Sequence, residues 1–85
     1  TQLSQLILYP NPASEYLELE QTGLNRFVKP TVRIYSLEGK LLFEQIMELD
    51  GGESPRVSVD HLNPGMYFLQ VQESNVNQVH KFIKS

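Results

Sequence analysis

Among the side chains that could perform acid–base chemistry, Asp60 and His61 are the only acid and imidazole that stand next to each other. Neighbouring residues of a β-strand point to opposite faces, so Asp60 would orient the His61 ring for catalysis only if both lay in a turn. No nucleophile is indicated beside them, and we interpret the pair as a solvated strand end. The second imidazole, His80, stands alone before Lys81 and is interpreted as a surface residue and not as a metal ligand.

Two groups of carboxylates have the chemistry to bind a cation. Asp50 and Glu53 flank two glycines, but Ca²⁺ takes roughly six to eight oxygen ligands, and two acids at a polar hairpin tip are typical of a turn. Glu15, Glu18 and Glu20 form the densest acidic stripe, which is typical of a solvated face that discourages edge pairing. The chain has no glycine-rich phosphate loop, no His-x-x-x-His pair and no nucleophile elbow. We therefore expect no cofactor, no metal and no enzymatic activity.

Aromatic side chains offer little for carbohydrate binding. That function usually needs an exposed aromatic platform, typically with Trp, and the chain contains no Trp. Tyr16, Tyr35 and Phe68 would replace such a platform only weakly.

The segment Lys81–Lys84 differs most from an ordinary β-domain. It combines two cations and two apolar side chains, and it lies one residue before the carboxylate of Ser85. If it forms an edge strand, its open N–H and C=O groups would be a template for strand addition by a partner. The alternative is a last strand whose lysines only discourage unwanted pairing. The residues by themselves leave both interpretations open.

The composition is that of one small globular domain. With 85 residues the chain hides only about 60 to 65% of its unfolded surface, which excludes two separate cores. An apolar content of 40% and a charged content of 20% disfavour disorder. The net charge of −3 and the scattered Lys and Arg residues argue against nucleic acid as a partner.

Targeting features and cysteines are missing from the sequence. The lack of Cys excludes disulfides, thiolate metal sites and thiol nucleophiles, but leaves the compartment open. No apolar run approaches the roughly 20 residues of a membrane span, and Thr1 begins no signal peptide. Because the sequence does not start with Met, we interpret it as a piece of a longer protein, with residues 1–5 as the end of a linker and 6–85 as the domain.

The elements that must position these side chains are strands, organised around Leu62–Val71. Pro64 presets its own φ and Gly65 accepts a positive φ, so this pair predicts a tight turn that opens directly into a strand. Beyond the turn, Tyr67, Leu69 and Val71 share one face, and Met66, Phe68, Gln70 and Gln72 share the other. This pattern predicts an inner strand of an antiparallel sheet whose second face is half covered.

The same alternation predicts six further strands, at residues 6–9, 14–21, 31–37, 41–49, 56–60 and 78–84. Leu17, Leu19, Val32, Ile34, Val57 and Val59 are the residues expected to face inward. In the fourth strand, Leu41 and Phe43 are in phase but Ile46 breaks that phase, so we expect a bulge near Glu44 or Gln45. In the last strand, His80 and Phe82 oppose Val79 and Ile83, and the pattern does not decide which face is buried.

Connections complete the expected fold. Pro10 and Pro12 stop the first strand in a rigid corner, and a hairpin closes at Gly39. In the loop between residues 22 and 30, Phe27 and Val28 are expected to pack down onto the edge of the domain. Residues 50–55 are the plainest loop, and 74–77 a turn. Strands repeating at roughly 8 to 12 residues predict a single, all-β, Ig-like antiparallel β-sandwich of about seven short strands, with an open β-barrel as the alternative.

Four segments resemble, in order, the type A C-terminal sorting domain of the type IX secretion system, also called the Por secretion system. They are the corner Tyr9–Ala13, the hairpin Val32–Lys40, the segment Leu62–Val71 and the terminal Lys81–Lys84. Each motif alone is weak, but four at matching distances over Leu6–Lys84 are specific. One departure is Ser36, where the family often has Asp; Ser makes a similar but weaker side-chain turn bond.

The resemblance implies a role in protein export. Such a domain is the last one of a protein that a Gram-negative bacterium sends to the periplasm with a signal peptide. The outer-membrane translocon and shuttle components of the type IX system would then recognise the folded domain and carry its upstream cargo across. A sortase-like cysteine peptidase would remove the domain, and the cargo would be released or joined to anionic lipopolysaccharide at the cell surface. The domain would be the substrate of an enzyme and not an enzyme.

By position, the resemblance also assigns residues. It places the cut in or before Thr1–Gln5. Recognition would depend on Lys81, Phe82, Ile83 and Lys84. The turn and motif residues would be Pro10, Asn11, Pro12, Gly39, Pro64, Gly65 and Tyr67. The alternative function is an accessory β-sandwich of a secreted hydrolase that binds polysaccharide or spaces domains.

Overall fold

The computed structural model describes residues 5–22, 26–49 and 55–85. The candidate cation ligands Asp50 and Glu53, and residues 1–4 of the expected linker, lie outside these ranges. Within them the chain forms seven strands: β1 (Gln5–Tyr9), β2 (Tyr16–Thr22), β3 (Thr31–Ser36), β4 (Leu41–Ile46), β5 (Arg56–Ser58), β6 (Gly65–Glu73) and β7 (Val76–Lys84).

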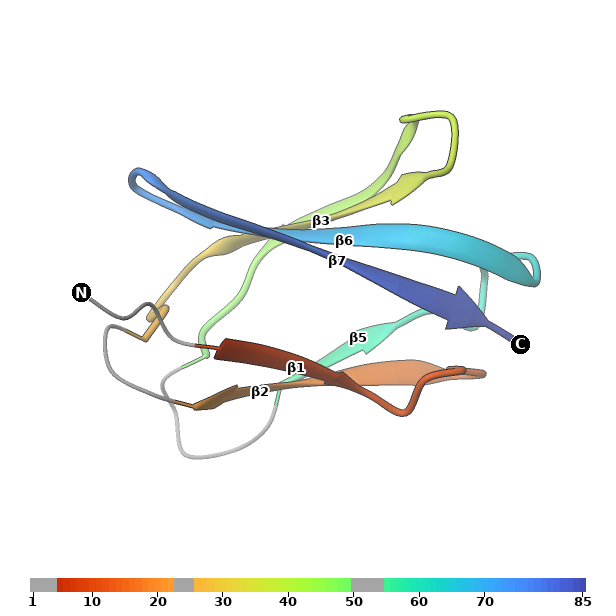
Figure 1. The fold of residues 1–85 in the computed structure, drawn as a ribbon, viewed down its shortest axis with the longest axis horizontal. Coiled ribbons are helices and arrows are strands. Elements are labelled where there is room, and N and C mark those ends of the chain that lie inside the picture. The colour runs from red at the N-terminus through yellow and green to blue at the C-terminus, as the bar shows by residue number, and fades with distance from the viewer. Residues whose placement is uncertain (1–4, 23–25, 50–54) are drawn as a thin grey trace.

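The strands form two sheets that lie face to face (Figure 1). The smaller sheet has the order β1-β2-β5 and the larger one β4-β3-β6-β7. All pairings between neighbouring strands are antiparallel. The prediction of an all-β antiparallel sandwich is confirmed, and the described strands do not join into the open barrel that was the alternative.

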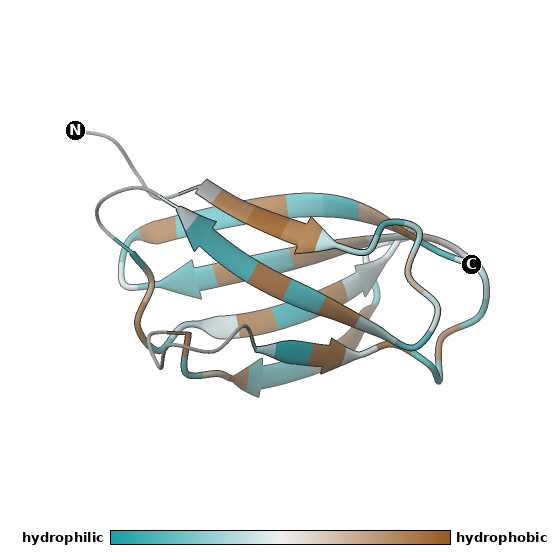
Figure 2. Cartoon of the chain, turned by 90° about the horizontal axis from the view of Figure 1, so that it is seen from below, coloured by the Kyte–Doolittle hydropathy of each residue, from teal (hydrophilic) through white to brown (hydrophobic). Residues whose placement is uncertain are grey.

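The core lies between the sheets because several strands, such as β2, β3 and β5, alternate buried apolar with more exposed residues. The changes of hydropathy are visible as bands along the ribbons in Figure 2. The residues predicted to face inward from β2, from β3 and from the segment at β5 are each at most 2% exposed. They are Leu17, Leu19, Val32, Ile34, Val57 and Val59. Tyr67, Leu69 and Val71 of β6 are also buried, and β6 lies between β3 and β7. Burying each large apolar side chain contributes about 1.5–3 kcal/mol, which holds the two sheets together.

The bulge of the larger sheet lies earlier than predicted. Ile34 pairs with Phe43 while Tyr35 pairs with Leu41, so Leu42 is the extra residue on β4. The expected position near Glu44 or Gln45 is therefore wrong. Because the bulge separates Leu41 from Phe43, these two residues are not in phase: Leu41 is 46% exposed, whereas Phe43 packs against the core.

Beyond Ile46, where β4 ends, the chain continues beside the loop that precedes β3. The amide of Met47 donates to the carbonyl of Pro30 at 3.0 Å, and that of Leu49 donates to Val28 at 2.9 Å. The strand predicted at residues 41–49 is therefore shorter in the structure, where β4 ends at Ile46. Residues 47–49 bond to the loop that ends at Pro30 and not to β3 itself.

In the loop before β3, Phe27 is buried as predicted, but Val28 is 52% exposed, and the expectation that it packs inward is wrong. The cause is the side-chain amide of Gln21. Its Oε1 accepts from the Phe27 amide at 2.6 Å and its Nε2 donates to the Phe27 carbonyl at 2.8 Å. This pairing fixes Phe27 facing inward, so the next residue points away. The Glu73 carboxylate then accepts from the amides of Val28 and Lys29.

The β6–β7 hairpin is tighter than predicted. Glu73 pairs with Val76, so the turn is Ser74–Asn75 and not 74–77, and β7 begins before Gln78. Ser74 adopts a left-handed φ of 54°, which a two-residue hairpin requires.

Candidate functional site

The terminal strand β7 divides the four residues of the expected recognition segment between two faces. Phe82 is fully buried and Lys84 is 8% exposed, so both face the core. Lys81 and Ile83 are exposed on the outer face of the sheet. Phe82 stacks on Tyr67, and Lys84 Nζ donates to the main-chain oxygen of Ser85 at 3.0 Å. Only Lys81 and Ile83 therefore present side chains to a partner.

Lys81–Lys84 lies at the edge of the larger sheet, as the hypothesis of strand addition requires. Its end, however, is closed by the proline corner. Asn11 Oδ1 accepts from the Ile83 amide at 2.9 Å. The Ala13 amide donates to the Ile83 carbonyl, and the Ser85 amide donates to the Ala13 carbonyl, each at 2.8 Å. The two main-chain bonds of Ala13 form an isolated parallel bridge with Lys84, which connects the corner between β1 and β2 to the end of β7.

Along the rest of the β7 edge, no main-chain hydrogen bond to another described segment is found. Main-chain groups alternate between the two sides of an antiparallel strand, and those of Ile83 point away from β6. The N–H and C=O groups of Asn77, Val79 and Lys81 therefore also point away from β6. Any strand added by a partner is limited to this stretch, between the hairpin turn and the corner.

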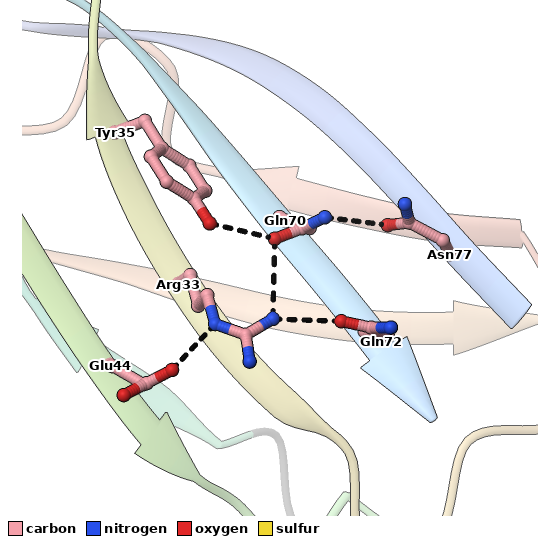
Figure 3. Close-up of polar contacts among 6 residues, drawn as sticks. All are labelled: Arg33, Tyr35, Glu44, Gln70, Gln72 and Asn77. Carbon is pink, nitrogen blue, oxygen red and sulfur yellow. Dashed lines mark hydrogen bonds and ion pairs between the residues drawn. The ribbon is translucent and has the colours of Figure 1, made fainter. Parts of the chain in front are cut away.

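A polar network crosses the middle of the outer face and includes residues from all four strands of the larger sheet (Figure 3). Its members are Arg33, Tyr35, Glu44, Gln70, Gln72 and Asn77. Arg33 Nε donates to Glu44 Oε2 at 2.6 Å, and Arg33 Nη1 donates to Gln72 Oε1 at 2.8 Å. The charge of Arg33 is thus paired within the domain.

Beside the network lies an apolar region that we call the terminal patch, formed by Tyr35, Met66, Phe68, Lys81 and Ile83. Met66 pairs with Ile83 and Phe68 pairs with Lys81 in the β6–β7 register, and Tyr35 pairs with Phe68 across β3 and β6. Met66 is 37% and Ile83 44% exposed. Within the described residues, no ion pair involves Lys81. The terminal patch therefore presents the ammonium group of Lys81 among apolar side chains.

Two of the predicted turn residues, Gly39 and Gly65, adopt a backbone conformation that suits glycine. Gly39 (φ 89°) and Gly65 (φ 154°) both have the positive φ that favours glycine. Ser36 Oγ accepts from the Lys40 amide at 3.1 Å, which is the side-chain turn bond expected at this departure from the family pattern. After Pro64, the Tyr67 hydroxyl donates back to the Asn63 carbonyl at 2.7 Å and ties β6 to its own turn.

The imidazoles show no catalytic arrangement. The Asp60 carboxylate accepts from the Ser58 hydroxyl at 2.7 Å, a bond that lowers the pKa of Asp60, and it lies 3.7 Å from His61 Nδ1. All three residues are exposed. Asp60 and His61 lie in the turn that the Leu62 amide closes by donating to the Val59 carbonyl, so the expectation that they form the end of a strand is wrong. His80 is not the surface residue we expected: it is partly buried on the inward face of β7, and burial lowers its pKa.

The remaining candidate groups are occupied or dispersed. Arg56 lies over the Tyr16 ring, 4.3 Å from its centroid, and its Nε is 3.3 Å from Glu18 Oε1. Tyr16 is therefore covered and is not an open platform for a sugar. Among residues 5–22, 26–49 and 55–85, no three His, Asp or Glu side chains gather as a metal site would require.

Comparison with known families decides the identity. Residues 7–85 match the model of the secretion system C-terminal sorting domain. This chain belongs to the family of type IX secretion C-terminal sorting domains. The match includes all four motifs that carried the resemblance, from Tyr9–Ala13 to Lys81–Lys84. No curated protein matches the chain.

Membership in this family makes the domain a sorting signal for type IX secretion, which implies export to the cell surface or the medium. It is a family of signals and not of enzymes. In the described part of the chain, the structure contains no helix with the length and hydropathy of a membrane span.

The contact between the two ends of the motif series was not predicted. From the sequence, we interpret Asn11 only as part of a rigid corner. The signal for the contact is the residue type, because an Asn side chain in a turn is able to bond to main-chain groups. The partner of Asn11, Ile83, lies 72 residues away, so no local pattern connects the two.

Proposed function

We propose that the outer-membrane translocon of the type IX system recognises the folded domain at the terminal patch. Lys81 and Ile83 make the contact, and Phe82 and Lys84 hold the strand on the core. The observation that carries this assignment is the alternation along β7, which exposes the first pair and buries the second. A partner suited to this surface has an apolar face with a carboxylate placed to meet Lys81.

The terminal patch supports recognition in the folded state. Its residues come from β3, β6 and β7, so the surface is assembled only when distant segments have folded together. A signal of this kind suits a system that transports folded cargo, because an unfolded chain would not present it.

The remaining steps are proposed from family membership. The precursor enters the periplasm with a signal peptide, and shuttle components receive the domain after the translocon. A sortase-like cysteine peptidase then cuts in or before Thr1–Gln5. The cargo is released or attached to anionic lipopolysaccharide, while the sorting domain is discarded.

A reporter fusion tests the function directly. Residues 6–85 are placed behind a reporter that carries its own signal peptide, in a strain with an active type IX system. We expect the reporter at the cell surface or in the medium. Accumulation of the intact fusion in the periplasm would contradict the proposal, and a strain lacking the translocon provides the control.

Single substitutions test the patch. Lys81→Glu and Ile83→Ser are expected to lower export, whereas Ile46→Ser should leave it unchanged. Ile46 is a suitable control because it is 61% exposed on the opposite edge strand of the same sheet. Deleting residues 81–85 is less informative, since it also removes Phe82 from the core. Normal export of the Lys81→Glu, Ile83→Ser double variant would exclude the patch as the recognition surface.

A further inference from the structure

We infer that Asn11 is a positioning residue of the sorting signal, which holds the end of β7 so that Lys81 and Ile83 are displayed at fixed places. This inference rests on the proposed function, because it concerns the same strand. The two family motifs at opposite ends of the chain, the proline corner and the terminal segment, thereby form one structural unit.

The hydrogen-bond pattern shows what the Asn11 side chain replaces. The Ala13–Lys84 bridge is parallel, and in a regular parallel ladder the carbonyl of Asn11 would accept from the Ile83 amide. Instead the side-chain Oδ1 of Asn11 accepts that bond at 2.9 Å. The corner thus continues the bridge by one bond without continuing as a strand.

The flanking prolines explain why a side chain is needed. Pro10 and Pro12 have no N–H group and hold the main chain in a bend, so the corner cannot run beside β7 as an ordinary strand. Ala13 supplies one donor and one acceptor to β7, both already used by Ile83 and Ser85. The amide of Ile83 therefore depends on the carboxamide of Asn11.

Two consequences for the signal follow. The Asn11 bond removes the Ile83 amide from the open edge, so an added strand can pair only as far as Lys81. It also holds the main chain of Ile83, and Ile83 and its neighbour on the same face, Lys81, are the exposed residues of the terminal segment. Without the bond, Ala13 would be the one described residue that holds the edge of β7 facing away from β6.

Amide hydrogen exchange of the 85-residue domain tests the contact without any assay of export. Asn11→Ala removes the acceptor, and Asn11→Asp keeps one. Asn75→Ala, an exposed Asn in the turn at the other end of β7, is the matched control. In Asn11→Ala we expect exchange at Ile83 to be about tenfold faster, with Leu69 unchanged. Asn11→Asp and Asn75→Ala should resemble the unmodified domain at Ile83.

Unchanged exchange at Ile83 in Asn11→Ala would overturn the inference. If Asn11→Ala also loses protection at Leu69, that variant has unfolded, and Asn11→Asp becomes the deciding variant. Faster exchange at Ile83 in Asn11→Asp, despite the retained acceptor, would overturn the inference. Normal protection at Ile83 in Asn11→Asp would support it.

Export of the reporter fusion then tests the consequence. We expect Asn11→Ala to lower export several-fold and Asn11→Asp to restore it. If Asn11→Ala is exported normally although exchange at Ile83 is faster, the positioning role is wrong and the proposed function stands. If the unmodified fusion is not exported, the proposed function is wrong, whereas the exchange result still reports on the contact.

Discussion

The rings of Tyr67 and Phe82 stack across β6 and β7 with their centroids 5.7 Å apart and their planes inclined by 24°. The two residues are directly opposed in the register, and the Tyr67 hydroxyl is bonded to the turn that begins β6. The terminal strand is therefore joined to the central strand through the core, and the exposed residues beside Phe82 are held by this buried one.

Phe82→Ala is expected to lower the free energy of unfolding by about 3–5 kcal/mol, since it leaves a cavity between two sheets. Small domains are stable by only about 5–15 kcal/mol, so the variant should be largely destabilised. Urea unfolding followed by circular dichroism measures the loss. Ile83→Ala, on the exposed face of the same strand, should change stability by less than about 1 kcal/mol; equal losses in both variants would contradict the assignment of faces.

Gln21→Leu should lower the free energy of unfolding by about 2–4 kcal/mol, because the buried amide and carbonyl of Phe27 both lose their side-chain partner. Denaturant unfolding measures this change. Gln45→Leu serves as the comparison, since Gln45 is exposed on β4. A neutral effect of Gln21→Leu would show that the loop before β3 is held by Phe27 packing alone.

The Arg33–Glu44 pair should show a coupling energy of about 0.5–1 kcal/mol in a double-mutant cycle with Arg33→Gln and Glu44→Gln. The pair is 2.6 Å apart and its side chains are 24% and 49% exposed. The coupling should fall as salt is added. The Lys29–Glu48 pair, at 3.8 Å with side chains 64% and 78% exposed, should show almost none; similar coupling in the two pairs would argue against a role for the network geometry.

His80 should make stability depend on pH. Burial lowers its pKa in the folded state below the ordinary value of 6.5, so the unfolded chain binds the proton more readily. The free energy of unfolding is therefore highest above pH 6.5 and falls as the pH drops from there through the folded-state pKa. Urea midpoints between pH 8 and pH 5 measure this fall, and subtracting those of His80→Gln isolates it. A difference between the two proteins that is constant with pH would refute the prediction.

Much of the sandwich follows from local pattern. In an alternating strand such as the one with Leu17 and Leu19, the apolar side chains lie on one face only. A shift of the strand pairing by one residue would turn them to solvent, so the pattern specifies which face is buried. The positive φ of Gly39 and Gly65 is equally local, because it depends on the absent Cβ. The bulge was misplaced because both sides of β4 carry apolar residues, and its position depends on how the hairpin closes and not on periodicity.

For the candidate site, the sequence identified the segment Lys81–Lys84 but not its exposed half. Apolar residues occur on both faces of β7, with Val79 and Ile83 on one and Phe82 on the other, so the alternation is ambiguous. The opposed ring of Tyr67 and the space between the sheets give Phe82 the buried place.

By itself, the sequence determined that this protein is an all-β sorting domain, because strand periodicity, turn residues and four ordered motifs are properties of short segments. Only the tertiary structure decided that Lys81 and Ile83 face outward and that Asn11 closes the edge beside them. The outward orientation follows from the packing of Phe82 against Tyr67 between the two sheets. The Asn11 contact depends on pairing between residues 72 positions apart, which arises when the two sheets pack and which no local interaction specifies.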